Sequence, residues 1–149
     1  MLLTYKLVQL IEEHSRPLAA GLLERVKKSP FLQEYRNVPD AELTQRVQEI
    51  YSQLGEWLTN GREQDIANRY SEIGARRAAQ GVPLSQLIWT IVLVKENLWE
   101  YLKRNAKAED LYELSGAHEM LQLLEQFFDR AMYFGAVGYE RKQQPDTER

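Results

Sequence analysis

The chain has 149 residues, of which 44% are hydrophobic, and its formal net charge is −3. This length favours a single domain with a sizeable core. The negative charge gives no electrostatic case for nucleic-acid binding, and the absence of cysteine excludes disulfides and cysteine-ligated zinc. No apolar run approaches the roughly 20 residues that span a bilayer, and the N-terminus lacks the features of a secretory signal, so we expect a cytoplasmic protein.

Helical periodicity runs through almost the whole chain. The first amphipathic segment covers about residues 3–28, and Pro17 inside it predicts a kink or break near residues 14–17, because proline donates no backbone hydrogen bond. Residues 29–39 contain two prolines and are typical of a connection. Further helices are expected over about residues 40–59, 62–80, 84–105 and 108–141.

Domain organisation follows from the short breaks between these segments. The glycine-containing breaks at residues 60–61 and 81–82 are too short to separate domains, and we find neither an internal repeat nor strand-like alternation. The sequence therefore predicts an all-α bundle of five to six helices over residues 1–142. Residues 143–149 are polar and are expected to form a flexible tail.

A tight corner joins two of the expected helices. Gly81 fits the left-handed residue that ends a helix, and Pro83 fits the first turn of the next helix, where its missing N–H is not needed. The apolar residues that are expected to face the core resume at Leu84, directly after Pro83. Gly74, in the preceding helix, is assigned to the same structural corner. The corner is predicted to fix how the two helices meet, and it contains no catalytic grouping.

The same region carries a family resemblance. Tyr70, Ile73, Gly74 and Arg77 form a Tyr-x-x-Ile-Gly-x-x-Arg run, which continues into Gly-Val-Pro-Leu-Ser-Gln-Leu-Ile-Trp at residues 81–89. This pattern resembles the N-terminal sensory domain of the stressosome co-antagonist proteins, the RsbRD type. Two weaker pieces agree with it: the opening amphipathic helix that ends in Lys-Lys-Ser-Pro, and the Phe-Phe-Asp-Arg-Ala-Met-Tyr run at residues 127–133.

The resemblance implies a helical, globin-like signal-input module, usually without haem, that precedes a STAS, PAS or histidine-kinase output domain. This chain ends at Arg149 without such an output domain. On the resemblance we expect either a domain that acts alone or the input half of a longer protein.

The last helix holds a heptad-like seam. Apolar and small residues follow 3-4-3-4 spacing, and a second row beside them widens the apolar surface beyond the stripe that one core requires. One interpretation is a central helix wrapped by neighbours in one chain; the other, which the resemblance favours, is a homodimer seam. The expected interface residues are Met120, Leu124, Phe127, Ala131 and Phe134.

Two cationic residues fall on inward-facing stripes. Arg77 shares a face with Tyr70, and Lys95 lies on the apolar line of the following helix. Such charges need an ion pair or a route to the surface. A carboxylate at residue 96, 125 or 129 is one candidate partner, and the alternative is an anion or polar-ligand pocket lined by Tyr70, Arg77 and Lys95.

Catalytic and metal-binding patterns are not recognisable. His14 and His118 are the two histidines and the only candidates for haem or metal ligation, but neither belongs to a paired ligand motif, so no metal or cofactor is expected. We predict a non-enzymatic signal-input and dimerisation domain of a bacterial stress-response protein, with a STAS or kinase-type partner downstream. The alternative is a small-ligand or haem sensor that uses the bundle interior.

Overall fold

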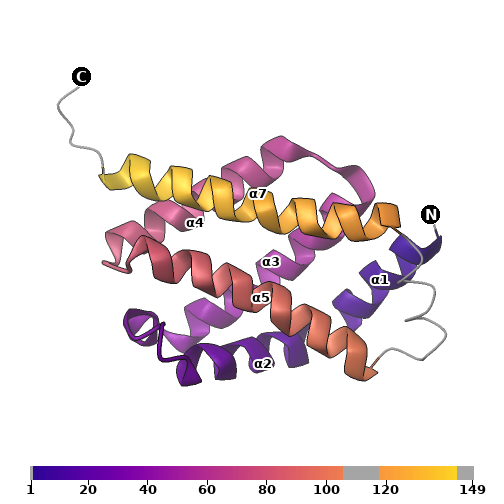
Figure 1. Ribbon diagram of the computed structural model, residues 1–149, viewed down its shortest axis with the longest axis horizontal. Helices are drawn as coiled ribbons and strands as arrows, with labels where there is room; N and C mark the ends of the chain where they lie inside the picture. Colours follow the sequence, from indigo (N-terminus) through magenta and orange to yellow (C-terminus); the bar gives the residue numbers. More distant parts are fainter. Residues whose placement is uncertain (1, 106–117, 144–149) are drawn as a thin grey trace.

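The computed structural model describes residues 2–105 and 118–143 (Figure 1). Within these ranges the chain forms six α-helices and one short 3-10 helix, and it contains no strand. The helices are α1 (Leu2–Glu13), α2 (Ser15–Lys28), η1 (Glu34–Asn37), α3 (Asp40–Asn60), α4 (Glu63–Ala79), α5 (Leu84–Asn105) and α7 (His118–Gln143). The predicted all-α bundle of five to six helices is confirmed. Residues 144–149, most of the predicted tail, lie outside the described part.

The predicted break in the first helical segment is present at His14, between α1 and α2. His14 leaves the helical conformation with φ −117° and ψ 21°. Its carbonyl still accepts a hydrogen bond from the backbone N–H of Leu18 at 3.0 Å. Pro17 is the third residue of α2, where a backbone N–H has no acceptor within the helix. The break therefore places the proline where its missing donor costs no helical hydrogen bond.

The connection between α2 and α3 is more ordered than its two prolines indicate. It contains the 3-10 helix η1, and three of its apolar side chains are buried in the core: Leu32, Tyr35 and Val38. The segment thus anchors the bundle and brings Tyr35 to the interior.

The helices pack in crossed layers around one hydrophobic core. Figure 1 shows α7 running along α4, with α5 in front and α3 crossing behind. The helix α5 contacts both α7 and α2, while α3 contacts α1, α2 and α7. No helix of the described ranges is long and apolar enough to cross a membrane.

A buried polar network joins three of these helices. The side-chain amide of Asn97 on α5 donates to the carbonyl of Leu18 at 2.9 Å and to the Tyr51 hydroxyl at 3.2 Å. Tyr51 on α3 in turn donates to the carbonyl of Val94 at 3.3 Å. Desolvation of the phenol raises the pKa of Tyr51 to about 12. Every member of this network has a partner, as buried polar groups require.

Candidate functional site

The interior between α3, α4 and α5 holds a buried guanidinium. Arg77 is 2% exposed, and its Nη1 lies 3.1 Å from a carboxylate oxygen of Glu42 on α3. Its Nε donates to the Tyr35 hydroxyl at 3.2 Å, and its Nη1 also donates to the Gln80 side-chain oxygen at 2.8 Å. The predicted ion pair of Arg77 is therefore present, but its partner is Glu42 and not residue 96, 125 or 129.

Lys95 does not join this interior site. Its ammonium lies 3.3 Å from a carboxylate oxygen of Glu125 on α7, one of the partners that the sequence indicated. Its neighbour Val94 faces the interior, and a step of one residue turns the next side chain by about 100° around the helix axis. The structure thus brings Tyr70 and Arg77 together and corrects the expected three-residue pocket by removing Lys95 from it.

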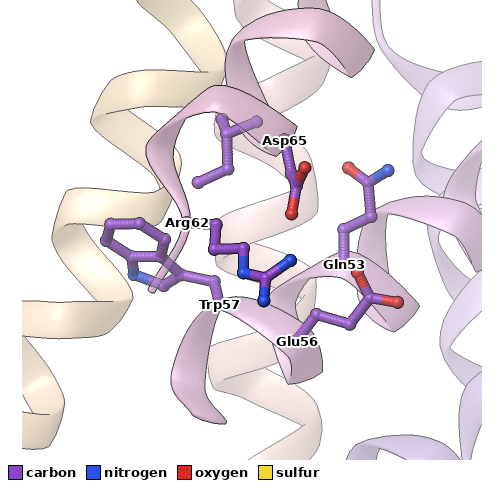
Figure 2. Close-up of a pocket in the computed structure, with 6 residues that line it drawn as sticks. Gln53, Glu56, Trp57, Arg62 and Asp65 are labelled. Atoms are coloured by element: carbon purple, nitrogen blue, oxygen red, sulfur yellow. The ribbon is translucent and has the colours of Figure 1, made fainter. Parts of the chain in front are cut away.

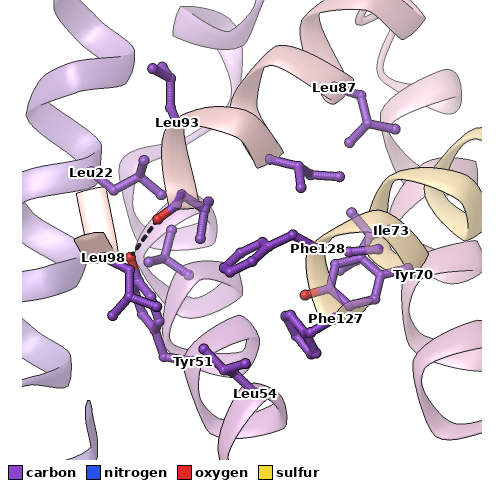
Figure 3. Close-up of a cluster of buried hydrophobic side chains, with 14 of the residues drawn as sticks. Leu22, Tyr51, Leu54, Tyr70, Ile73, Leu87, Leu93, Leu98, Phe127 and Phe128 are labelled. Carbon is purple, nitrogen blue, oxygen red and sulfur yellow. Dashed lines mark hydrogen bonds between the residues drawn. The ribbon is translucent and has the colours of Figure 1, made fainter. Parts of the chain in front are cut away.

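Tyr70 and Arg77 both line a small interior cavity of about 30 Å³. Most of its wall is aliphatic, supplied by α2, α3, α4 and α5: Leu22, Leu43, Val47, Ile50, Ile73, Leu87, Ile91 and Val94. Tyr70 is 1% exposed, and its hydroxyl has no hydrogen-bond partner among the described residues. Figure 3 shows this hydroxyl turned inward, into the side chains of the core. Burial raises the pKa of Tyr70 and of Tyr35, so both phenols stay neutral.

The ring of Tyr70 connects this cavity to the last helix. Its edge-to-face contact with Phe127 of α7 has ring centroids 5.9 Å apart and an interplanar angle of 83°. Phe127 packs in the same way on Phe128, at 5.3 Å. An aromatic row therefore runs from the cavity wall into α7, as Figure 3 shows.

The corner between α4 and α5 has the predicted left-handed glycine. Gly81 has φ +74°, its N–H bonds to the carbonyl of Ala78 at 3.1 Å, and the next N–H, of Val82, bonds to the carbonyl of Arg77 at 3.0 Å. This pair of bonds is the Schellman ending of a helix. Pro83 lies one residue before α5 and its carbonyl accepts the N–H of Leu87, so it precedes the first turn that we assigned to it. The Tyr139 hydroxyl of α7 donates to the carbonyl of Val82 at 2.6 Å and ties α7 to this corner.

Gly74, which the sequence grouped with that corner, lies elsewhere. It belongs to what we call the glycine crossing, where Gly74 of α4 meets Gly135 and Gly138 of α7. A Cβ on Gly74 would lie 2.0 Å from the carbonyl oxygen of Gly135, and one on Gly138 would lie 2.0 Å from the carbonyl oxygen of Ser71. The two backbones therefore touch directly, and neither position has room for a side chain.

The seam residues of α7 face the core of their own chain. Leu124, Phe127 and Ala131 are at most 1% exposed, so their side chains are not available to a second molecule. This placement corrects their assignment to an interface and follows from the position of α7 against α3, α4 and α5. Phe134 is half-buried at the edge, and the Met120 side chain lies outside the described residues.

The opposite side of the crossing carries an open groove between α4 and α7, which we call the outer groove. It has a volume of about 580 Å³ and is lined by Gln64, Ala67, Asn68, Ser71, Glu72, Tyr133, Phe134, Val137 and Arg141. Tyr133 is 64% exposed there, and its ring packs on that of Phe134 with centroids 5.1 Å apart. The groove thus exposes one aromatic side chain among small, polar and charged residues.

A second surface pocket lies at the turn between α3 and α4. It measures about 250 Å³, and Figure 2 shows polar side chains of both charges around it, with the Trp57 side chain at one edge: Gln53, Glu56, Arg62 and Asp65. Trp57 donates its indole N–H to the carbonyl of Leu123 at 2.9 Å. This pocket was not predicted, because its residues combine two helix ends that show no joint pattern in the sequence.

The structure gives His14 a structural role. Its Nδ1 lies 2.8 Å from the carbonyl of Leu10, and its ring packs on Tyr101 with centroids 5.4 Å apart. The His118 side chain lies outside the described residues. Within the part of the chain that the structure covers, no three histidine, aspartate or glutamate residues gather as metal ligands would.

Comparison with known families agrees with this architecture. Residues 16–148 match the family described as the RsbT co-antagonist protein rsbRD N-terminal domain. No curated protein matches the chain, and no solved structure matches it either. The match covers most of the 149 residues and includes the corner, the glycine crossing and the whole of α7. The chain belongs to the family of RsbT co-antagonist protein RsbRD N-terminal domains, a regulatory signalling family and not an enzyme family.

Proposed function

We propose that this domain is the signal-input and dimerisation module of a cytoplasmic stress-response protein. Family membership supports a signalling role, and the observation that carries the mechanism is the two-sided packing of α7. On one side Gly74 and Gly138 bring the backbones of α4 and α7 into direct contact. On the other side the outer groove presents Tyr133 to solvent.

The occupant that we propose for the outer groove is a second copy of the chain. A twofold interface sets one patch against itself, so the patch must be self-complementary. Glu72 on α4 and Arg141 on α7 line the same groove and supply both charges. Small side chains at Ala67 and Ser71 leave space opposite the Tyr133 ring of a partner.

Signal transfer would then use the rigidity of the glycine crossing. Because no side chains separate the two backbones, α4 cannot shift without moving α7 or opening the contact. The Tyr139 hydrogen bond to the corner adds a second tie between the same elements. A change around α4 would thus pass along α7 to a STAS, PAS or kinase-type output partner.

A reporter of the stress response in the natural host tests this function. Tyr133→Glu places a charge in the outer groove and should abolish the regulated response while the protein still accumulates. Phe31→Glu is the matched control, because Phe31 is an equally exposed aromatic residue, at 65%, and packs on Trp89 away from the groove. Equal reporter responses in the two variants would contradict the proposal.

Ligand sensing through the interior remains the second candidate, and the free Tyr70 hydroxyl favours it. The cavity that Tyr70 lines measures about 30 Å³, which is far smaller than a porphyrin. The protein should therefore purify without a Soret band. A haem spectrum that disappears in His14→Ala or His118→Ala would overturn this expectation.

A further inference from the structure

The interior cavity combines a small space between buried side chains with a buried hydroxyl that has no partner among the described residues. Tyr70 is almost wholly buried, lines the cavity and has a hydroxyl without a partner among the described residues. A buried hydroxyl left unpaired destabilises the folded state, so native proteins rarely keep one without a partner. Arg46 also lines the cavity, and its Nε is buried and without a partner within the described ranges.

The charges around this cavity are already balanced. Arg77 is paired with Glu42 at 3.1 Å, and the Nη1 of Arg46 binds both carboxylate oxygens of Glu49, at 2.9 and 2.8 Å. The Tyr70 phenol is held neutral by its burial. A charged guest would lose its hydration without gaining a counter-ion, which is costly. The cavity is therefore suited to a neutral molecule.

Its size narrows the class of guest further. A cavity needs about 10–15 Å³ to hold one water molecule, and a water occupies about 30 Å³ in the liquid. The observed volume of about 30 Å³ thus matches a molecule of one or two heavy atoms. The aliphatic wall accepts an apolar part of such a molecule, while the hydroxyl offers one hydrogen bond.

We propose that this cavity is a binding site for a neutral molecule of one or two heavy atoms that hydrogen-bonds to the Tyr70 hydroxyl. When that molecule is not bound, a water molecule takes its place. The Tyr70 ring that borders the site also contacts Phe127 of α7. Binding of such a molecule in the cavity would therefore affect the packing of α7, the helix that we propose carries the signal. This regulatory meaning rests on the proposed signal-input function, whereas binding itself does not.

Thermal unfolding of Tyr70→Phe tests whether the hydroxyl has a partner. Loss of a hydrogen bond to a guest or to water should lower Tm by about 2–4 °C. If the hydroxyl faces nothing, its removal relieves an unpaired polar group and Tm rises, which would overturn the proposal; an unchanged Tm would do so as well. Tyr51→Phe is the reference for a buried hydroxyl with partners, since Tyr51 contacts Val94 and Asn97, and it should lower Tm.

Methanol and methylammonium, two probes of the same size, test the class of guest. In the full chain, nuclear Overhauser effects from methanol to the methyl groups of Ile73 and Ile91 are expected, and Tyr70→Phe should abolish them. Methylammonium should give none. Absence of the methanol signals, their persistence in Tyr70→Phe, or equal signals from methylammonium would each overturn the proposal. None of these outcomes depends on the reporter, so the site and the signalling function can fail separately.

Discussion

Two neighbouring parts of the buried face of α4 differ in how they meet the rest of the bundle. At Gly74, backbone touches backbone and a single added carbon would collide with α7. At Tyr70 and Arg77, long side chains line a cavity and a charged group is buried. One helix face therefore combines a direct backbone contact with a region packed through long side chains. We propose that a change among those side chains would pass to α7 through the backbone contact.

The largest effect is expected at the glycine crossing. Gly138→Ala places a Cβ 2.0 Å from the Ser71 carbonyl oxygen, so α4 and α7 must separate. We expect the free energy of unfolding to fall by more than about 3 kcal/mol, above the usual range for overpacked cores, because the clash is with backbone. Urea denaturation followed by circular dichroism measures it.

Gly55→Ala is the matched control for this substitution. A Cβ on Gly55, also within a helix, would meet the Val8 side chain at 3.5 Å, which is ordinary contact. It should stabilise the protein by about 0.5–1 kcal/mol through helix propensity. Similar effects at the two glycines would contradict the direct backbone contact at the glycine crossing.

A smaller effect is expected from the buried ion pair. Glu42→Gln removes the counter-charge of Arg77 but keeps an amide oxygen that can accept its N–H. Because the Glu42 side chain is 21% exposed, we expect a loss of about 2 kcal/mol, less than for a fully buried pair. Glu125→Gln, which breaks the more exposed pair with Lys95, should cost less than about 1 kcal/mol. A larger loss at Glu125 would contradict the assignment of the interior site.

A further effect should appear only in alkaline solution. Burial raises the pKa of Tyr35, Tyr51 and Tyr70 above the value of about 10 in the unfolded chain. Below pH ~10 both states hold these protons and the contribution to stability is complete. Between about pH 10 and 12 the unfolded chain releases protons that the folded chain keeps, so stability falls as pH rises. Denaturation midpoints that stay constant across this range would contradict the buried positions of these phenols.

Local features of the fold could be predicted from the sequence because each depends on neighbouring residues. The break at His14, the left-handed Gly81 and the start of α5 at Leu84 all follow from proline, glycine and helical period. The 3-10 helix within residues 29–39 was not predicted, since prolines mark the connection without showing its buried side chains.

Long-range pairings could not be predicted in the same way. Periodicity placed Arg77 inward, but nothing in the sequence identified Glu42, which lies on another helix. Gly74 and Gly138 each lack a side chain, and only their meeting in space gives that a meaning. The apolar residues of α7 likewise fit a contact with a partner molecule and a contact with the chain's own core equally well. The structure shows that Phe127 packs in the chain's own core.

Sedimentation equilibrium of the unmodified chain tests most directly whether the outer groove joins two copies. We expect a dimer at micromolar concentration for the unmodified protein and for Phe31→Glu. We expect a helical monomer for Tyr133→Glu, because the charge would be buried at the twofold contact. A monomeric unmodified protein, or a Tyr133→Glu variant that still dimerises, would contradict dimerisation through the outer groove.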